Sequence, residues 1–363
     1  MATSFPARGR FAVDPHHRYR IIENDYVRDI LDQPRTLEAT LQGLGIPASF
    51  PAVVQRLERR EWRRIVLTGM GSSFFALYPL SIQLTASGFA PVLLETSELL
   101  YYFPNLFDQE TLMIVVSQSG KSAEIVRLLD ENRGRAYLIA VTNTAASPLA
   151  ERSNTVFLTA AGQEFSVSCK TYVTALLALD WLGSLLTAAH TGTTASALPQ
   201  AAPAAGGYLD GWQDKVEELA ARLEGFRHLF LVGRGGSLAA VGTGSLILKE
   251  SVHCFSEGMS SAAFRHGPFE MVTERSCVLV FAGDVRTRQL NSKLWEDIRH
   301  KGGQAEIVGA DAELASLRLP VVPASVLPIL EILPVQLITL ALAAQTGREA
   351  GRFVLGSKVT IVE

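Results

Sequence analysis

The residues with the clearest chemical potential lie in the stretch SQSGKS, residues 117–122. Polar side chains there surround Gly120, between an apolar run that predicts a buried strand and a pattern that predicts a helix. The first N–H groups of a helix lack internal partners and carry positive partial charge, so an anion binds well there. A plain loop with one capping serine is the alternative, but three serines with glutamine and glycine favour an anion site. The side chains that would bond a phosphate are Ser117, Gln118, Ser119 and Ser122.

Three further residues are candidates for proton transfer or covalent chemistry. Glu250 lies in an apolar, helix-like stretch, where burial would raise the pKa of its carboxyl and suit it to proton abstraction. His266 precedes Gly-Pro at a predicted turn, and histidine shuttles protons at neutral pH. Lys358 lies in a segment of small and apolar residues, where a desolvated amine can form a Schiff base. From the residues alone, a solvated helix face, a structural histidine and a surface lysine remain the alternatives.

The elements that position these residues repeat along the chain. Each copy has an apolar run, a G-x-G turn, a serine and then a helix-like pattern, and strands that alternate with helices predict parallel α/β sheets. The repetition predicts a duplicated fold. The first copy has Gly69, Gly71 and Ser73, and at a constant offset of 164 the second has Gly233, Gly235 and Ser237.

The two turns predict one anion site rather than two. Ser73 follows a strand that we expect beside the strand before the SQSGKS loop, so both face one pocket. The matching loop of the second half, FAGDVRT, lacks the serine and glutamine cluster, so that half has diverged. Dinucleotide binding requires glycine or alanine at the sixth position of the fingerprint, where Phe74 and Leu238 stand, and this disfavours a nicotinamide cofactor.

Composition narrows the class of protein further. With 363 residues, a net charge of −3 and a pI near 6.2, the chain has no basic field for nucleic acid or an acidic membrane. Its cysteines, Cys169, Cys254 and Cys277, form no metal-binding pattern and fit a reducing compartment. The N-terminus has no apolar core of a signal peptide, and residues 319–344 contain Glu331 and four prolines, which predicts a buried helix. We therefore expect a soluble cytoplasmic protein.

Together these motifs resemble a double SIS (sugar isomerase) protein, and in particular the isomerase half of the glutamine–fructose-6-phosphate transaminases. The similarity covers most of residues 25–363, through TGMGSS, SQSGKSAE, AGQEFSVSCKT, EGMSSAAFRHGP and KVTIVE. It implies two flavodoxin-like α/β/α subdomains, each with a five-stranded parallel sheet. The expected division is an N-terminal segment and helix (1–45), a first SIS domain (46–190), a linker (191–210), a second SIS domain (211–350) and a tail with Lys358 (351–363).

The resemblance also implies a role for each candidate residue. Glu250 would move a proton between C1 and C2 of a sugar, and Lys358 would form a Schiff base with a ketone. His266 would open the sugar ring in the site of a neighbouring subunit, so a homodimer with shared active sites is expected. Val167 would line the substrate. The residues implied to bind the phosphate of a hexose 6-phosphate or amino-sugar phosphate are Ser73, Ser117, Gln118, Ser119 and Ser122.

Departures from the family pattern leave the reaction open. Ile247 replaces a second lysine, the AGQEFSVSCKTY loop is one residue shorter, and the tail lacks the Asp-x-Pro-Arg run. We expect no glutaminase domain and no initiating cysteine in this chain, so glutamine-dependent transfer is not expected of it. We expect an aminosugar-phosphate isomerase/deaminase or an aminotransferase-like enzyme that needs no metal or organic cofactor. The alternatives are a fructosamine-6-phosphate deglycase, a plain sugar-phosphate isomerase, or a non-catalytic sugar-phosphate sensor.

Overall fold

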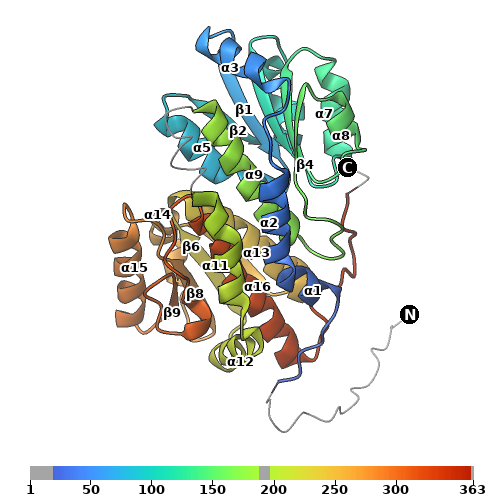
Figure 1. The fold of residues 1–363 in the computed structure, drawn as a ribbon. Helices are drawn as coiled ribbons and strands as arrows, with labels where there is room; N and C mark the ends of the chain where they lie inside the picture. Colours follow the sequence, from blue (N-terminus) through green and yellow to red (C-terminus); the bar gives the residue numbers. More distant parts are fainter. Residues whose placement is uncertain (1–18, 188–196, 361–363) are drawn as a thin grey trace, which may run out of the picture.

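The computed structural model describes residues 19–187 and 197–360, which form two α/β units packed against each other (Figure 1). The first sheet is parallel in the order β2-β1-β3-β4-β5, and the second is parallel in the order β7-β6-β8-β9. The strands of the first sheet are β1 (Arg64–Gly69), β2 (Pro91–Glu95), β3 (Thr111–Val116), β4 (Tyr137–Thr142) and β5 (Thr155–Leu158). Those of the second are β6 (His228–Gly233), β7 (Phe255–Ser260), β8 (Ser276–Phe281) and β9 (Gln304–Val308).

Helices cover the sheets, so the central strands are apolar runs rather than alternating patterns. Every residue of β3 and β8 is buried, which is typical of parallel strands covered on both faces. The N-terminal helices are α1 (Asp25–Leu31), α2 (Gln33–Gly43) and α3 (Phe50–Glu58). The first unit has α4 (Ser72–Phe75), α5 (Leu77–Ala86), α6 (Thr96–Tyr102), α7 (Ala123–Asn132), α8 (Pro148–Arg152) and α9 (Lys170–Leu186). The second has α11 (Ala201–Leu209), α12 (Trp212–Arg222), α13 (Leu238–Val252), α14 (Ser261–Arg265), α15 (Arg288–His300) and α16 (Leu327–Thr346).

The second sheet has four strands in the described part of the chain, and the prediction of five was wrong there. After β9 the chain makes a single parallel bridge, from Gly309 to Arg318. Pro320 and Pro323 follow at once, and a proline has no N–H to donate to a ladder. The segment therefore passes the edge of the sheet without extending it.

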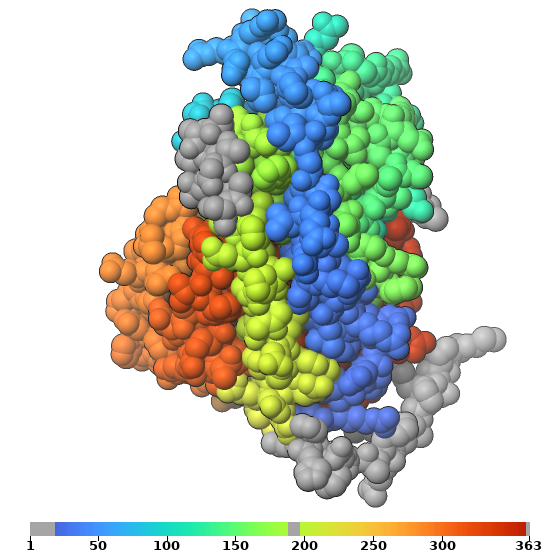
Figure 2. All heavy atoms as spheres, viewed as in Figure 1, coloured from blue at the N-terminus to red at the C-terminus, as the bar shows by residue number. Residues whose placement is uncertain are grey.

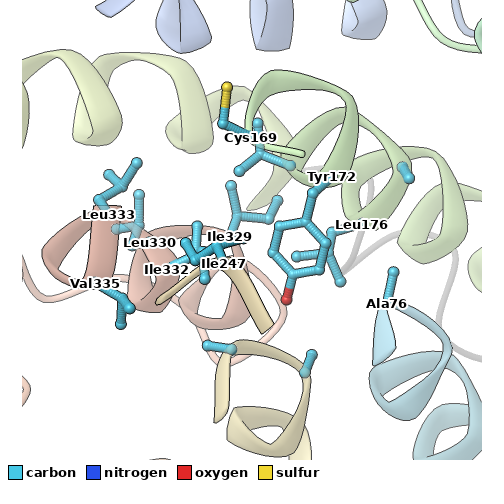
Figure 3. Close-up of a cluster of buried hydrophobic side chains, with 14 of the residues drawn as sticks. Ala76, Cys169, Tyr172, Leu176, Ile247, Ile329, Leu330, Ile332, Leu333 and Val335 are labelled. Atoms are coloured by element: carbon cyan, nitrogen blue, oxygen red, sulfur yellow. The ribbon is translucent and has the colours of Figure 1, made fainter. Parts of the chain in front are cut away.

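One hydrophobic core runs through both units. Tyr172 and Leu176 of α9 lie against the apolar face of α16, including Ile329 and Ile332, and Ile247 of α13 lies in the same cluster (Figure 3). Helix α16 is long and apolar enough to span a membrane, but 89% of its apolar window is buried inside the protein. It is the buried helix that the sequence predicted, and it fixes the two units to each other.

The segment predicted as a linker, residues 191–210, is helical where it is described. A short 3-10 helix (Leu198–Gln200) leads into α11, which packs against α2 and α16. Figure 2 shows α2 and α11 running side by side across the junction of the units. Alanine has the highest helix propensity of all residues, so an alanine-rich stretch without charge forms a helix once it has a surface to pack on. Residues 191–196 lie outside the described part.

The N-terminal helices are anchored by the C-terminal part of the chain. Asn24 donates a hydrogen bond of 2.8 Å from Nδ2 to the carbonyl of Ala350, and the buried amides of Gln33 and Gln336 bond to each other. Beyond α16, residues 351–360 form neither helix nor strand. From the end of α16, residues 351–360 run back along the first unit.

Candidate sugar-phosphate site

A pocket of about 330 Å³ lies between the carboxyl ends of β1 and β3, the segment before α9, helix α13 and the C-terminal tail. The carboxyl ends of neighbouring parallel strands meet at one edge of a sheet, which is where ligands bind in open α/β folds. Eight of the nine predicted site residues line this pocket: Ser73, Ser117, Gln118, Ser119, Ser122, Val167, Glu250 and Lys358. They come from both units, so neither unit has the whole site.

The geometry of the SQSGKS loop differs from that of a serine-capped helix. Ser122 is the N-cap residue of α7, but its hydroxyl makes no capping hydrogen bond and lines the pocket instead. Gly120 has a φ of +62°, and a Cβ there would lie 2.3 Å from the Oγ of Ser147. Ser117 Oγ accepts a 3.1 Å bond from the N–H of Gly120, which fixes the turn. The alternative of a serine-capped loop is therefore excluded for Ser122.

The C-terminal tail forms one wall of the pocket. Phe353, Ser357 and Lys358 line it, followed by Val359 and Thr360. The carbonyl of Thr360 accepts a 3.1 Å hydrogen bond from the N–H of Ala123, the first residue of α7. This carbonyl supplies a partner for one of the N–H groups that a helix N-terminus leaves unpaired. The tail is thus attached beside the predicted phosphate loop.

Glu250 faces the pocket from the last turn of α13. Burial raises the pKa of its carboxyl, and the positive charges of Lys358 and Lys249 oppose that shift. A carboxylate that is half-buried in a pocket, with a raised pKa, suits a general base for a C–H proton beside a carbonyl. Glu250 therefore does not lie on a solvated helix face.

Glu164 is the functional candidate that sequence reasoning missed. Its buried carboxylate accepts hydrogen bonds from the N–H groups of Cys169 and Thr171, at 3.0 and 2.9 Å, and from Thr171 Oγ1 at 2.7 Å. The fourth donor is the ammonium of Lys358, 2.7 Å away, which also donates to the carbonyl of Ser166. A carboxylate just before the first turn of α9 is favoured by the helix dipole, and this was the available signal.

A buried ion pair supports the loop that carries Glu164. The N–H of Phe165 donates a 2.8 Å hydrogen bond to Asp29 Oδ2 of α1, and Lys170 Nζ lies 2.9 Å from Asp29 Oδ1. Lys170 also reaches Asp32, at 3.3 Å. Both Lys170 and Asp29 are buried and have little contact with water, so each charge is stabilised by the other instead of by solvent. The N-terminal helix thereby fixes the position of the pocket wall.

His266 is the one predicted residue that the single chain does not bring to the pocket. It directly follows α14, is exposed, and is not among the lining residues. The expectation that it acts in the site of a neighbouring subunit therefore stays a prediction.

Comparison with known proteins shows which families the chain is similar to. Residues 60–185 match the SIS domain family. Glutamine–fructose-6-phosphate aminotransferase (isomerizing) from Pyrococcus horikoshii is 28% identical over 341 residues, which cover 91% of this chain and 56% of that protein. The chain thus spans little more than half the length of this curated relative.

Solved structures show the same fold over nearly the whole chain. A protein from Silicibacter pomeroyi, proposed to be a phosphosugar isomerase, is 27% identical with a TM-score of 0.76, and the match covers 90% of this chain and 99% of that one. Glucosamine-6-phosphate deaminase from Thermotoga maritima shares the fold at 19% identity, with a TM-score of 0.75 and coverage of 93% and 100%.

Proposed function

We propose that this chain, a member of the SIS phosphosugar isomerase family, is an aminosugar-phosphate isomerase/deaminase or aminotransferase-like enzyme that acts on a hexose 6-phosphate. The observation that carries the proposal is that the serine loop and Glu250 face one pocket from different units. A phosphate held at the loop would fix the sugar, and Glu250 would then meet its C1–C2 end. The pocket volume lies within the range of small-molecule sites, about 300–1,000 Å³.

The phosphate would bind at the N-terminus of α7, with hydroxyl donors from the serine loop. Glu250 would take the proton from one sugar carbon and return it to the neighbouring carbon through an enediol or enolamine. With a ketose, the ammonium of Lys358 and the C2 carbonyl would condense to a protonated imine and one water. Charge is conserved in that step, and the cation stays beside the carboxylate of Glu164.

Ring opening would require a proton shuttle at the ring oxygen and O1. We propose that His266 of a second copy supplies it in a homodimer, because histidine is a common proton shuttle in catalysis and this side chain is exposed in the single chain. Under this proposal each site contains residues of two subunits.

A plain sugar-phosphate isomerase is the second candidate, and one contact favours it. Lys358 already donates to Glu164 and to Ser166, so its ammonium is engaged before any substrate arrives. Proton transfer by Glu250 and ring opening by His266 need no imine. A fructosamine-6-phosphate deglycase would use the same proton transfer with a larger leaving amine, and a sensor would use the serine loop alone.

The test is a product assay with purified protein. Glucosamine 6-phosphate is assayed for release of ammonia and fructose 6-phosphate, and fructose 6-phosphate with ammonia for the reverse reaction. We expect turnover that Glu250→Gln lowers by at least about 10²-fold, since general bases contribute about 10²–10⁴-fold. Glu38→Gln, the same change at an exposed site on α2, is the control. Binding of both sugars without turnover in either direction would exclude the isomerase/deaminase.

Assays with further substrates distinguish the alternative functions from one another. A plain isomerase would interconvert hexose 6-phosphates without releasing ammonia, and it would tolerate Lys358→Met. A deglycase would release a free amine from a fructosamine 6-phosphate. A sensor would bind hexose 6-phosphate with the same affinity whether residue 250 is glutamate or glutamine.

A further inference from the structure

The duplicated fold builds a second cleft that the proposed reaction does not use. It has a volume of about 360 Å³ and lies between the loops after β6 and β8 and helices α5 and α9 of the first unit. The start of α16 closes it through Pro328. Its walls contain both apolar side chains and carboxylates.

The offset of 164 residues shows that this cleft is the counterpart of the candidate site. Leu246 and Glu250 of α13 line the candidate site, and the residues 164 positions earlier, Ile82 and Ala86 of α5, line the second cleft. Each cleft is therefore formed by the loops of one unit and the helix that follows the first strand of the other. The methyl group of Ala86 replaces the carboxylate of Glu250, so the second cleft lacks the general base.

The phosphate loop has also lost its function in the second copy. Strands β3 and β8 align at an offset of 165, so Ser119 corresponds to Asp284. The carboxylate of Asp284 accepts a hydrogen bond from the guanidinium of Arg286, with an Nε–Oδ2 distance of 2.9 Å. The N–H of Arg286 donates to Asp284 Oδ1 as well, also at 2.9 Å. Asp284 thus occupies a turn where the first copy offers hydroxyls, and its charge opposes a phosphate. The cleft does not fit the ligand of the first site.

Asp180 indicates which kind of ligand the second cleft would bind. It lines the cleft from α9, and its Oδ2 is buried with no hydrogen-bond partner among the described residues. Burial raises the pKa of its carboxyl to about 7. A buried acceptor without a donor carries a desolvation penalty that a ligand N–H can remove. Ile82, Leu176 and Pro328 provide apolar surface around it.

We propose that the second cleft binds a small organic cation, a primary amine on a compact apolar body. The ammonium would donate to the carboxylate of Asp180, and the apolar body would lie against Ile82 and Leu176. Asp284 adds negative charge, while Arg286 is already paired with it. This binding site is independent of the reaction proposed for the first pocket.

The experiment is calorimetric titration of the full chain at pH 8, where Asp180 is ionised, with cyclohexylamine and with cyclohexanol as a neutral analogue of the same shape. We expect the amine to bind at least about tenfold more tightly than the alcohol, the size of one charge-assisted hydrogen bond. Asp180→Asn should remove that preference. Equal affinity for the two probes, or an unchanged preference in Asp180→Asn, would overturn the proposal.

Two controls separate this cleft from the first pocket. Ala86→Leu fills the second cleft and should weaken amine and alcohol alike, without relying on the folding of the Asp180 variant. Glu250→Gln changes only the first pocket and should leave amine binding as it is. If Glu250→Gln abolishes amine binding and Ala86→Leu does not, the amine binds in the first pocket and the proposal is wrong.

Discussion

Lys358 Nζ lies 2.7 Å from Glu164 Oε2, and this pair connects the C-terminal tail to the N-terminus of α9. Glu164 is buried and already accepts three hydrogen bonds from its own loop, so its position is fixed by the fold. The lysine is only partly buried, at 23% side-chain exposure, and depends on the pair for its place in the pocket. The loop therefore orients the tail, and not the reverse.

Replacing Glu164 with glutamine should loosen the tail. The variant keeps the shape of the side chain but loses the ionic partner of Lys358, a charge-assisted contact worth about 1.5–3 kcal/mol. We expect amide hydrogen exchange of residues 351–360 to speed up by about tenfold or more, and KM for the sugar phosphate to rise more than kcat falls. Glu38→Gln is the control, and unchanged exchange in the tail would contradict the assigned role.

Gly120→Ala should remove sugar-phosphate binding. A Cβ at residue 120 would lie 2.3 Å from Ser147 Oγ, and the φ of +62° is unfavourable for alanine. The matched control is Gly134→Ala, where φ is +75° but nothing lies within 4 Å of the added Cβ. Calorimetry with fructose 6-phosphate should show at least about tenfold weaker binding for Gly120→Ala alone, while both variants lose about 1 kcal/mol or more of stability. Equal binding in the two variants would show that the loop does not hold the phosphate.

Mixing two inactive variants tests the shared site. Glu250→Gln and His266→Ala should each be inactive alone, because each removes one part of every site. In a mixed dimer, the subunit that retains Glu250 receives His266 from its partner and regains one complete site. Co-refolded equal mixtures should recover about a quarter of wild-type activity, from half the dimers being mixed with one site each. No recovery, with mixed dimers confirmed by mass spectrometry, would place His266 in the site of its own chain.

Glu331 should make stability depend on pH. Burial raises the pKa of its carboxyl to about 8, opposed by a hydrogen bond from Ser237, whereas the unfolded chain titrates near 4.5. Between pH 4.5 and about pH 8 the carboxyl of Glu331 is protonated in the folded state and ionised in the unfolded state. The free energy of unfolding therefore falls as pH rises through this range, by up to about 1.4 kcal/mol per pH unit.

Glu331→Gln keeps an acceptor for Ser237 and cannot titrate, so its denaturant unfolding curves at pH 5 and pH 7.5 should differ less than those of the wild type. Glu38→Gln should keep the wild-type slope. A Glu331→Gln variant as pH-dependent as the wild type would show that other groups cause the effect.

The sequence predicted the features that neighbouring residues determine, and it did not predict those that depend on contacts between distant parts of the chain. The serine loop, the G-x-G turns and the buried helix around Glu331 are formed by neighbouring residues, and their patterns predicted them. The alanine-rich segment before α12 forms a helix that its composition did not reveal, because this helix depends on packing against α2, far away in sequence. The role of Glu164 was missed for the same reason, since its partner Lys358 lies 194 residues away. His266 does not line the pocket of its own chain, so the structure of a single chain does not test the role predicted for it.

The contact of the N-terminal helix with the end of the chain has a consequence for biosynthesis. Asn24 bonds the backbone at Ala350, and Tyr26 receives a hydrogen bond of 3.2 Å from Thr339. The partners in each pair lie more than 300 residues apart, so a ribosome makes the second partner only after the strands of both sheets. The first sheet can form early, and Asp29 of α1 can then pair with Lys170, but the contacts of α1 with α16 form only after the last helix emerges. The pocket, which Phe353 and Lys358 line, is therefore completed only after α16 and the tail have been made.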